Sequence, residues 1–237
     1  MKKKRKKYKK KSVKRNQKTS LFGWFVWSLL GILLLPILAS VLFATSMLLW
    51  QIPLLSSTIA YIGIGFVLYS AFHLIIYQPI VLYVMAHELT HAAFAMLLGI
   101  RVRKIKVSSK GGYVEMTRSN FVIDLAPYFF PLYTILLTSI FYTLHRIYGL
   151  ENYYWLFFIS IGISFAFHLL SNWDVLMIEQ PDLNATGKVF GIIFVLILNL
   201  VFVNLILMII FIDYVNLQTL AENLFMSWDY VYKILTN

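Results

Sequence analysis

Two histidines and a glutamate with the spacing of a metal site stand within the first half of the chain. The sequence reads His87-Glu88-Leu89-Thr90-His91, and residues four apart on a helix lie one turn apart on the same face. Two imidazole nitrogens can therefore point at one ion, as in the HExxH pattern of zinc hydrolases. Glu88 is offset by about 100° on such a helix and can accept a proton from water, whose pKa zinc lowers to about 7. The spacing predicts a zinc centre with His87 and His91 as ligands and Glu88 as general base.

The surroundings of this motif strengthen the prediction. Between residues 57 and 99 the side chains that carry charge near neutral pH are His73, His87, Glu88 and His91. A charged side chain at membrane depth costs about 2.5–3.5 kcal/mol on insertion scales, and metal coordination recovers that cost. The alternative is a buried polar cluster that bonds to a neighbouring helix. His73 is interpreted as a helix-packing or interfacial histidine.

Zinc needs a third protein ligand, which leaves the fourth position for water. Asp182 and Asp174 lie in the connection over residues 171–188, Asp124 begins an apolar segment, and His168 is a further candidate. We favour Asp182, with Asp174 as the next candidate, because Asp182 follows a proline and precedes the last long apolar segment. The alternative for Asp182 is an acid at a helix start, where the helix dipole favours negative charge.

The composition around these residues is that of a membrane protein. Apolar residues make up 60% of the 237 residues and charged residues 13%, whereas a soluble domain has about 25% charged residues. Several apolar stretches approach the roughly 20 residues that a helix needs to cross hydrocarbon. We predict an all-α polytopic membrane protein with about six transmembrane helices, or five, within one domain over residues 21–237. The apolar stretches are Leu21–Met47, Ser57–Tyr77, Ile80–Gly99, Phe121–Leu144, Tyr153–Leu170 and Val189–Ile212.

The net charge of +11 comes from the N-terminus, where residues 1–18 carry twelve Lys/Arg and no acid. A block of like charge favours disorder, so residues 1–20 are predicted to be a disordered, basic, cytoplasmic tail. Lys and Arg beside a membrane span hold that flank in the cytoplasm and attract anionic lipid. We therefore expect a multi-pass protein of the plasma membrane with a lipid-binding tail, and no nucleic-acid partner. The absence of Cys excludes disulfides and thiolate ligands.

The most polar interior segment, Arg101–Asn120, holds six of the nine basic residues outside the tail. Val102, Ile105 and Val107 alternate before a Ser-Ser-Lys-Gly-Gly turn, and a second apolar arm follows it. This pattern predicts a β-hairpin directly after the HExxH helix.

The charges leave one conflict in the topology. If the tail and the hairpin are both cytoplasmic, an even number of crossings must precede residue 101, yet three apolar segments do. Either one of them is re-entrant or interfacial, or two form one crossing that bends at Pro79. The second option strains the length, because the 43 residues of Ser57–Gly99 at about 1.5 Å each exceed the bilayer about twofold.

Further residues extend the HExxH motif into a pattern that resembles the site-2 protease family of intramembrane zinc metalloproteases. That family shows an Ala four residues after the second His and a Gly four residues further on, which are Ala95 and Gly99 here. It also tends to carry a Gly-Gly-Tyr-Val stretch followed shortly by Met, matched by residues 111–114 and Met116. The alternating β-branched residues that follow the Gly are matched by Ile100, Val102 and Ile105.

The third element of the family is an Asn, prolines and then Leu-Asp-Gly, whose Asp completes the zinc site. This sequence has Asn172, Pro181 and Asp182 at a similar distance, but Leu183 stands where the family has Gly. The chain therefore resembles a divergent or minimal member of the family.

The resemblance implies an intramembrane zinc peptidase that cuts transmembrane or signal-peptide-derived segments of membrane-embedded substrates near their cytoplasmic end. It also implies a hairpin that dips toward the active site from the cytoplasmic side. Because a transmembrane helix hides its peptide bonds in its own hydrogen bonds, a strand edge there can hold the unwound substrate. The residues expected to bind substrate are Val102, Val107, Gly112, Tyr113 and Val114.

Two other functions are compatible with the sequence. One is a catalytically inactive membrane protein of the same fold that acts as a partner or immunity factor. The other is a transporter with intramembrane histidines as a metal relay, against which the sequence shows no inverted repeat. No oligomeric state is inferred.

Overall fold

The computed structural model describes residues 21–54, 56–76, 79–176, 182–183 and 187–236 of the chain. The described part is mainly helical, and it contains five helices long and apolar enough to cross a membrane. A bent helix pair brings the number to six if it forms one span. The predicted helical architecture is confirmed, with helices that suit membrane spans by length and composition. The predicted disordered tail over residues 1–20 lies outside the described residues.

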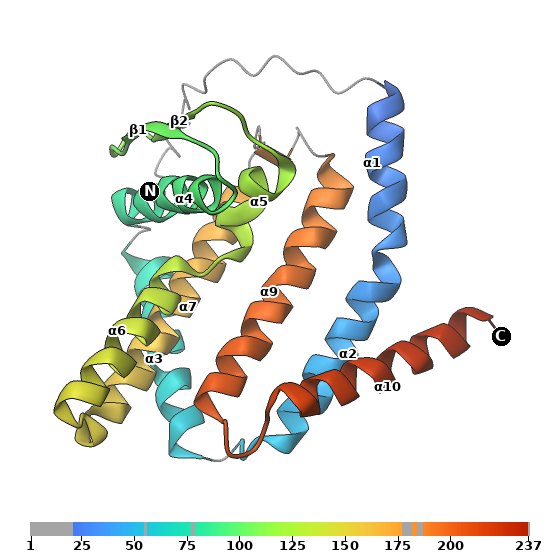
Figure 1. Ribbon diagram of the computed structural model, residues 1–237. Helices are drawn as coiled ribbons and strands as arrows, with labels where there is room; N and C mark the ends of the chain where they lie inside the picture. Colours follow the sequence, from blue (N-terminus) through green and yellow to red (C-terminus); the bar gives the residue numbers. More distant parts are fainter. Residues whose placement is uncertain (1–20, 55, 77–78, 177–181, 184–186, 237) are drawn as a thin grey trace.

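One group of helices combines the N-terminal and C-terminal segments of the described chain (Figure 1). Helices α1 (Leu21–Leu33) and α2 (Leu35–Gln51) follow one another with a break just before Pro36, which is tolerated because proline fits the first turn of a helix. Helix α9 (Lys188–Ile210) packs against both of them, and α10 (Leu217–Thr236) crosses α2. The apolar stretches of the sequence do not include α10, because polar residues interrupt its apolar ones.

A second group consists of α3 (Ser57–Ile75), α6 (Leu132–Tyr148) and α7 (Tyr154–Leu176), which follows a short 3-10 turn. Helices α3 and α7 make the most extensive helix contact in the described chain. Their backbones approach closely because each contributes a glycine at the crossing. A Cβ added at Gly65 would lie 2.0 Å from the carbonyl oxygen of Ile159, and small residues of this kind are how membrane helices pack.

Helix α4 (Ile80–Leu97) carries the HExxH motif and leads into the hairpin. The chain leaves α4 through Gly99, whose φ of 68° is a left-handed conformation that favours glycine. Strands β1 (Val102–Lys106) and β2 (Tyr113–Met116) then pair antiparallel, with a bulge near the start of β1. The predicted hairpin is confirmed.

The prediction of a single helix over Phe121–Leu144 is wrong. The chain forms α5 (Phe121–Phe129) and then α6, and their axes are bent by 68°. Asn120 caps α5 by accepting a hydrogen bond from the backbone N–H of Ile123. The break falls at Phe130, which is extended because it precedes Pro131, and a residue before proline avoids the helical conformation.

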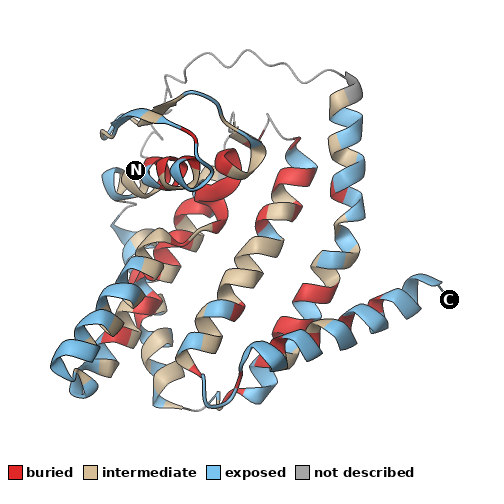
Figure 2. Ribbon diagram, in the orientation of Figure 1, coloured by how far each residue is buried: buried red, intermediate tan, exposed pale blue. Residues whose placement is uncertain are grey.

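The most deeply buried part of the protein surrounds α5. Figure 2 shows that buried residues gather where α4, α5 and the nearby end of α7 meet. Tyr128 and Phe129 of α5 pack there with Leu183 and with Phe190 of α9. Aromatic rings from α1, α4 and α9 surround this cluster. The motif helix is thus held against the core on one side and covered by the hairpin on the other.

Candidate metal centre

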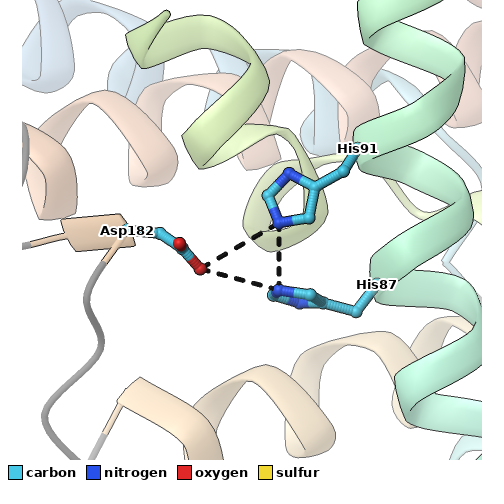
Figure 3. A group of neighbouring side chains, drawn as sticks. All are labelled: His87, His91 and Asp182. Atoms are coloured by element: carbon cyan, nitrogen blue, oxygen red, sulfur yellow. Dashed lines mark hydrogen bonds and ion pairs between the residues drawn. The ribbon is translucent and has the colours of Figure 1, made fainter. Parts of the chain in front are cut away.

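Three side chains from two distant parts of the sequence converge on one point (Figure 3). The Nε2 atoms of His87 and His91 lie 3.2 Å apart. Asp182 Oδ2 lies 3.7 Å from the first and 4.0 Å from the second. Both histidines are buried, as their position on the inner face of α4 requires. Among the described residues, these three form the group of His, Asp or Glu side chains that could hold a metal ion.

The spacing of these three atoms fits zinc. Atoms with these separations share one point that lies about 2.1 Å from each of them, which is the length of a zinc–nitrogen or zinc–oxygen bond. Two imidazoles and one carboxylate are also a donor set that catalytic zinc sites use, with the remaining position open to water. The residues present therefore fit the ion that the sequence predicts.

The other nitrogen of each imidazole is held by a hydrogen bond. His91 Nδ1 donates to the backbone carbonyl of Ile123, 2.7 Å away in α5. His87 Nδ1 lies 3.2 Å from the hydroxyl oxygen of Tyr83, one turn earlier on α4. With the proton on Nδ1, each Nε2 presents its lone pair to the shared point, which is how metal-binding histidines are usually oriented.

Asp182 is positioned by Tyr128, a residue that no sequence motif indicated. The Tyr128 hydroxyl donates to Asp182 Oδ2 at 3.3 Å, and its ring stands edge-on to His87 with ring centroids 5.5 Å apart. Leu183 packs into the core cluster around α5. The carboxylate is thus oriented both by a hydrogen bond and by the burial of its neighbour.

The backbone of Tyr128 is in turn fixed by amides from two other helices. Asn172 of α7 and Asn199 of α9 donate through Nδ2 to the Tyr128 carbonyl at 3.2 and 3.0 Å. This carbonyl lies next to the break between α5 and α6, where the regular helical ladder ends. Since an unsatisfied buried carbonyl costs about 1–3 kcal/mol, the two asparagines stabilise the break. Asn172 is one of the residues that carry the resemblance to the site-2 protease family, whereas no pattern in the sequence indicates Asn199.

The other candidate ligands have different partners. Asp174 Oδ2 pairs with His73 Nε2 at 3.0 Å, a link between α7 and α3. Asp124 accepts a hydrogen bond from Ser119 at 2.5 Å. His168 lies 3.2 Å from Asn199 Oδ1. In the described part of the chain, none of these three residues belongs to the group around His87 and His91.

Glu88 is buried beneath the hairpin. A Cβ added to Gly112 would lie 2.6 Å from Glu88 Cγ and 2.8 Å from a methyl carbon of Val84. It would also lie 2.6 Å from the carbonyl oxygen of Lys106, on the opposite arm of the hairpin. Only a residue without a side chain therefore fits at position 112 with the hairpin this close to α4. The hairpin covers the carboxylate that the sequence predicts to be the base.

A small cavity adjoins the histidine pair on the side of α7. Its volume is about 20 Å³, which is enough for one water molecule. The lining includes His87, Tyr83 and Thr90 from α4 and His168 and Asn172 from α7. Their polar atoms can supply the two to four hydrogen bonds that a buried water needs.

The residues expected to bind substrate lie on the hairpin above the motif. Val102 packs beside the buried Ala95 and Ile123, so its role includes holding the hairpin on the core. Val114 lies opposite Ile105, and Tyr113 lies opposite Lys106, in the paired region. Val107 follows the end of β1. In the described part of the chain the sheet has two strands, so each strand keeps one edge without a strand partner.

Comparisons of the chain with protein-family models, with curated proteins and with solved structures find no match.

Proposed function

We propose that the protein is a membrane-embedded zinc peptidase, of the site-2 protease type, that hydrolyses peptide bonds in transmembrane or signal-peptide-derived segments. The observation that carries the proposal is the convergence of His87, His91 and Asp182 at separations that suit one zinc ion. It is supported by the buried acid beside the ligands and by the strand edges above it.

His87, His91 and Asp182 would hold the ion, with Tyr83, Tyr128 and the Ile123 carbonyl orienting them. A bound zinc ion supplies Lewis acidity, which makes water nucleophilic near neutral pH and stabilises negative charge on the substrate oxygen.

Glu88 is the general base of the proposed reaction. Its buried carboxylate accepts a proton from the attacking water and transfers it to the leaving nitrogen, so that the peptide bond breaks with no net change in the enzyme. General base catalysis of this kind contributes about 10²–10⁴-fold to a rate. Burial under Gly112 keeps bulk water away from this carboxylate.

The hairpin binds the substrate in an extended form. A helical segment has its peptide groups in internal hydrogen bonds, so it has to unwind before its carbonyl can be attacked. A strand edge of the β1–β2 sheet replaces the lost hydrogen bonds by pairing with the unwound segment. Val102, Val107, Gly112, Tyr113 and Val114 belong to this surface.

The test compares two carboxamide variants of the full-length protein in liposomes, with a panel of transmembrane peptides as substrates. Glu88→Gln keeps the shape of the side chain and removes its basicity, so we expect zinc content to stay at one ion per chain and cleavage to fall at least about 100-fold. Glu222→Gln, an exposed carboxylate on α10 away from the hairpin, is the matched control and should cleave normally. Cleavage by Glu88→Gln at the wild-type rate would rule out the mechanism, and a wild-type protein that binds no zinc would rule out the function.

A further inference from the structure

Helix α4 runs in a different direction from the other helices that could span a membrane. In Figure 1, α3, α6, α7 and α9 run between the upper and lower ends of the protein, whereas α4 runs across their upper ends. The hairpin lies above α4, on the outer side. The length and composition of α4 suit a membrane span, but its direction suits a helix that lies in the plane of a membrane surface.

The face of α4 that points away from the core is an apolar stripe without a covering element in the described chain. Leu82, Leu89 and Met96, which are seven residues apart, are all exposed, and the exposed fraction of the neighbouring Leu97 is 78%. The opposite face holds the buried ligand histidines. A helix with one face in the core and one exposed apolar face suits contact with acyl chains at the interface.

The hairpin beside this stripe carries a strong positive charge. Six Lys/Arg stand between residues 101 and 118 against a single acid, Glu115, and all six are exposed. Exposed basic residues next to an apolar face are the pattern that anionic lipid headgroups attract. Each such residue near the surface contributes about 1 kcal/mol to the attraction.

We propose that α4 and the hairpin together form a surface that binds the headgroup region of an anionic membrane leaflet, and that α4 does not cross the bilayer. The α1–α2 pair and α3 then give two crossings before residue 101. The basic tail and the basic hairpin come to lie on the same side, as the distribution of positive charge requires. This removes the conflict that three apolar segments before the hairpin create.

This membrane-binding surface has a consequence for the zinc site. The consequence rests on the proposed function. With α4 at the headgroup level, hydrolysis takes place at the boundary of the bilayer and not at its centre. The substrate segment then needs to unwind only near its end, where water can satisfy the exposed peptide groups. The membrane position can be measured without any activity, so that failure of one proposal is distinguishable from failure of the other.

The absence of Cys in the chain allows single-Cys variants to be spin-labelled and their depths measured in vesicles of phosphatidylcholine and phosphatidylglycerol. Labels at Leu82→Cys and Leu97→Cys, near the two ends of α4, should lie at the same shallow depth in the bilayer. If α4 crossed the bilayer, these depths would differ by about 22 Å at 1.5 Å per residue, which would overturn the proposal. Labels at Ile64→Cys and Ile75→Cys on α3, where both side chains are exposed, should differ in depth by about 16 Å on the same scale and provide the control.

A second measurement tests the anionic part of the proposal. A label at Ser109→Cys, in the hairpin turn, should become less accessible to a water-soluble relaxation agent when phosphatidylglycerol is added to phosphatidylcholine vesicles. The effect should weaken at high salt, which screens exposed charges, and disappear when Arg103, Lys104 and Lys106 are all replaced by Gln. Equal accessibility in both lipids would show that the hairpin does not bind anionic headgroups.

Discussion

The hydroxyl of Tyr128 donates a hydrogen bond to Asp182 across 3.3 Å, and this contact joins two segments that lie 54 residues apart in the sequence. Tyr128 belongs to α5, which also supplies the carbonyl that orients His91. The same short helix therefore fixes ligands on both sides of the candidate metal centre. Partners of this kind, one bond away from the ligands, commonly change metal affinity 10–100-fold when they are lost.

We predict that Tyr128→Phe weakens zinc binding by about 10–100-fold without unfolding the protein. The ring keeps its packing against His87, while Asp182 loses the hydrogen bond that orients it. Competition with a chelator of known affinity measures the change in Kd. Tyr154→Phe is the control, because the Tyr154 hydroxyl contacts His145 near the opposite end of α7. Equal zinc affinities in both variants would contradict the role of Tyr128.

The two aspartates that the sequence offered as third ligand should behave differently. Asp182→Asn removes one of three ligands, so we expect the purified protein to lose stoichiometric zinc. Asp174→Asn should keep it, because Asp174 pairs with His73 away from the centre. Elemental analysis of both variants after dialysis gives the answer. If Asp174→Asn loses zinc and Asp182→Asn keeps it, Asp174 and not Asp182 is the third ligand.

The close contact between Gly112 and Glu88 predicts a functional cost for any side chain at position 112. Gly112→Ala puts a methyl carbon 2.6 Å from Glu88 Cγ, so either the hairpin or the carboxylate has to move. We expect zinc content to remain normal and cleavage to fall at least 10-fold, which is about 1.4 kcal/mol in the activation free energy. Ser109→Ala, at the exposed tip of the same hairpin, is the control. Normal cleavage by Gly112→Ala would show that the hairpin is free to withdraw from α4.

The glycine contact between α3 and α7 predicts a cost in stability. Gly65→Ala would bring a methyl carbon within 2.0 Å of the Ile159 carbonyl, and overpacking of this kind costs about 1–3 kcal/mol. Thermal unfolding in detergent should show the loss. Gly63→Ala, two residues earlier on α3, meets nothing within 4 Å and should unfold like the wild type. A melting temperature that is unchanged in Gly65→Ala would mean that the two helices pack less closely than described.

The HExxH part of the candidate metal centre was predictable because the decisive signal is local. His87, Glu88 and His91 lie within five residues, and the period of a helix alone determines which of them share a face. The hairpin was predictable for the same reason, since alternation and a Gly-Gly turn stand next to each other in the sequence. Asp182 was favoured over Asp174 from its place before a helix, and the structure brings Asp182 to the histidines.

The remaining parts depend on contacts between distant segments. Hydrogen bonds connect Asn199 to Tyr128 and Tyr128 to Asp182, which lie in three different segments. No spacing in the sequence predicts these contacts. The break between α5 and α6 did have a signal, because Pro131 interrupts the apolar segment, yet hydropathy alone made that segment look continuous. The direction of α4 depends on how the helices pack, which a hydropathy pattern does not contain.

The asparagine contacts at the α5–α6 break also bear on how the protein is made. The two histidines leave the ribosome well before Asp182, and Asn199 follows later still. For much of its synthesis the nascent chain therefore has the two histidines of the candidate metal centre without the aspartate. Zinc that arrives early finds two imidazoles without the carboxylate. The candidate metal centre and the asparagine contacts that hold its short helix can therefore be complete only after α9 has been synthesised.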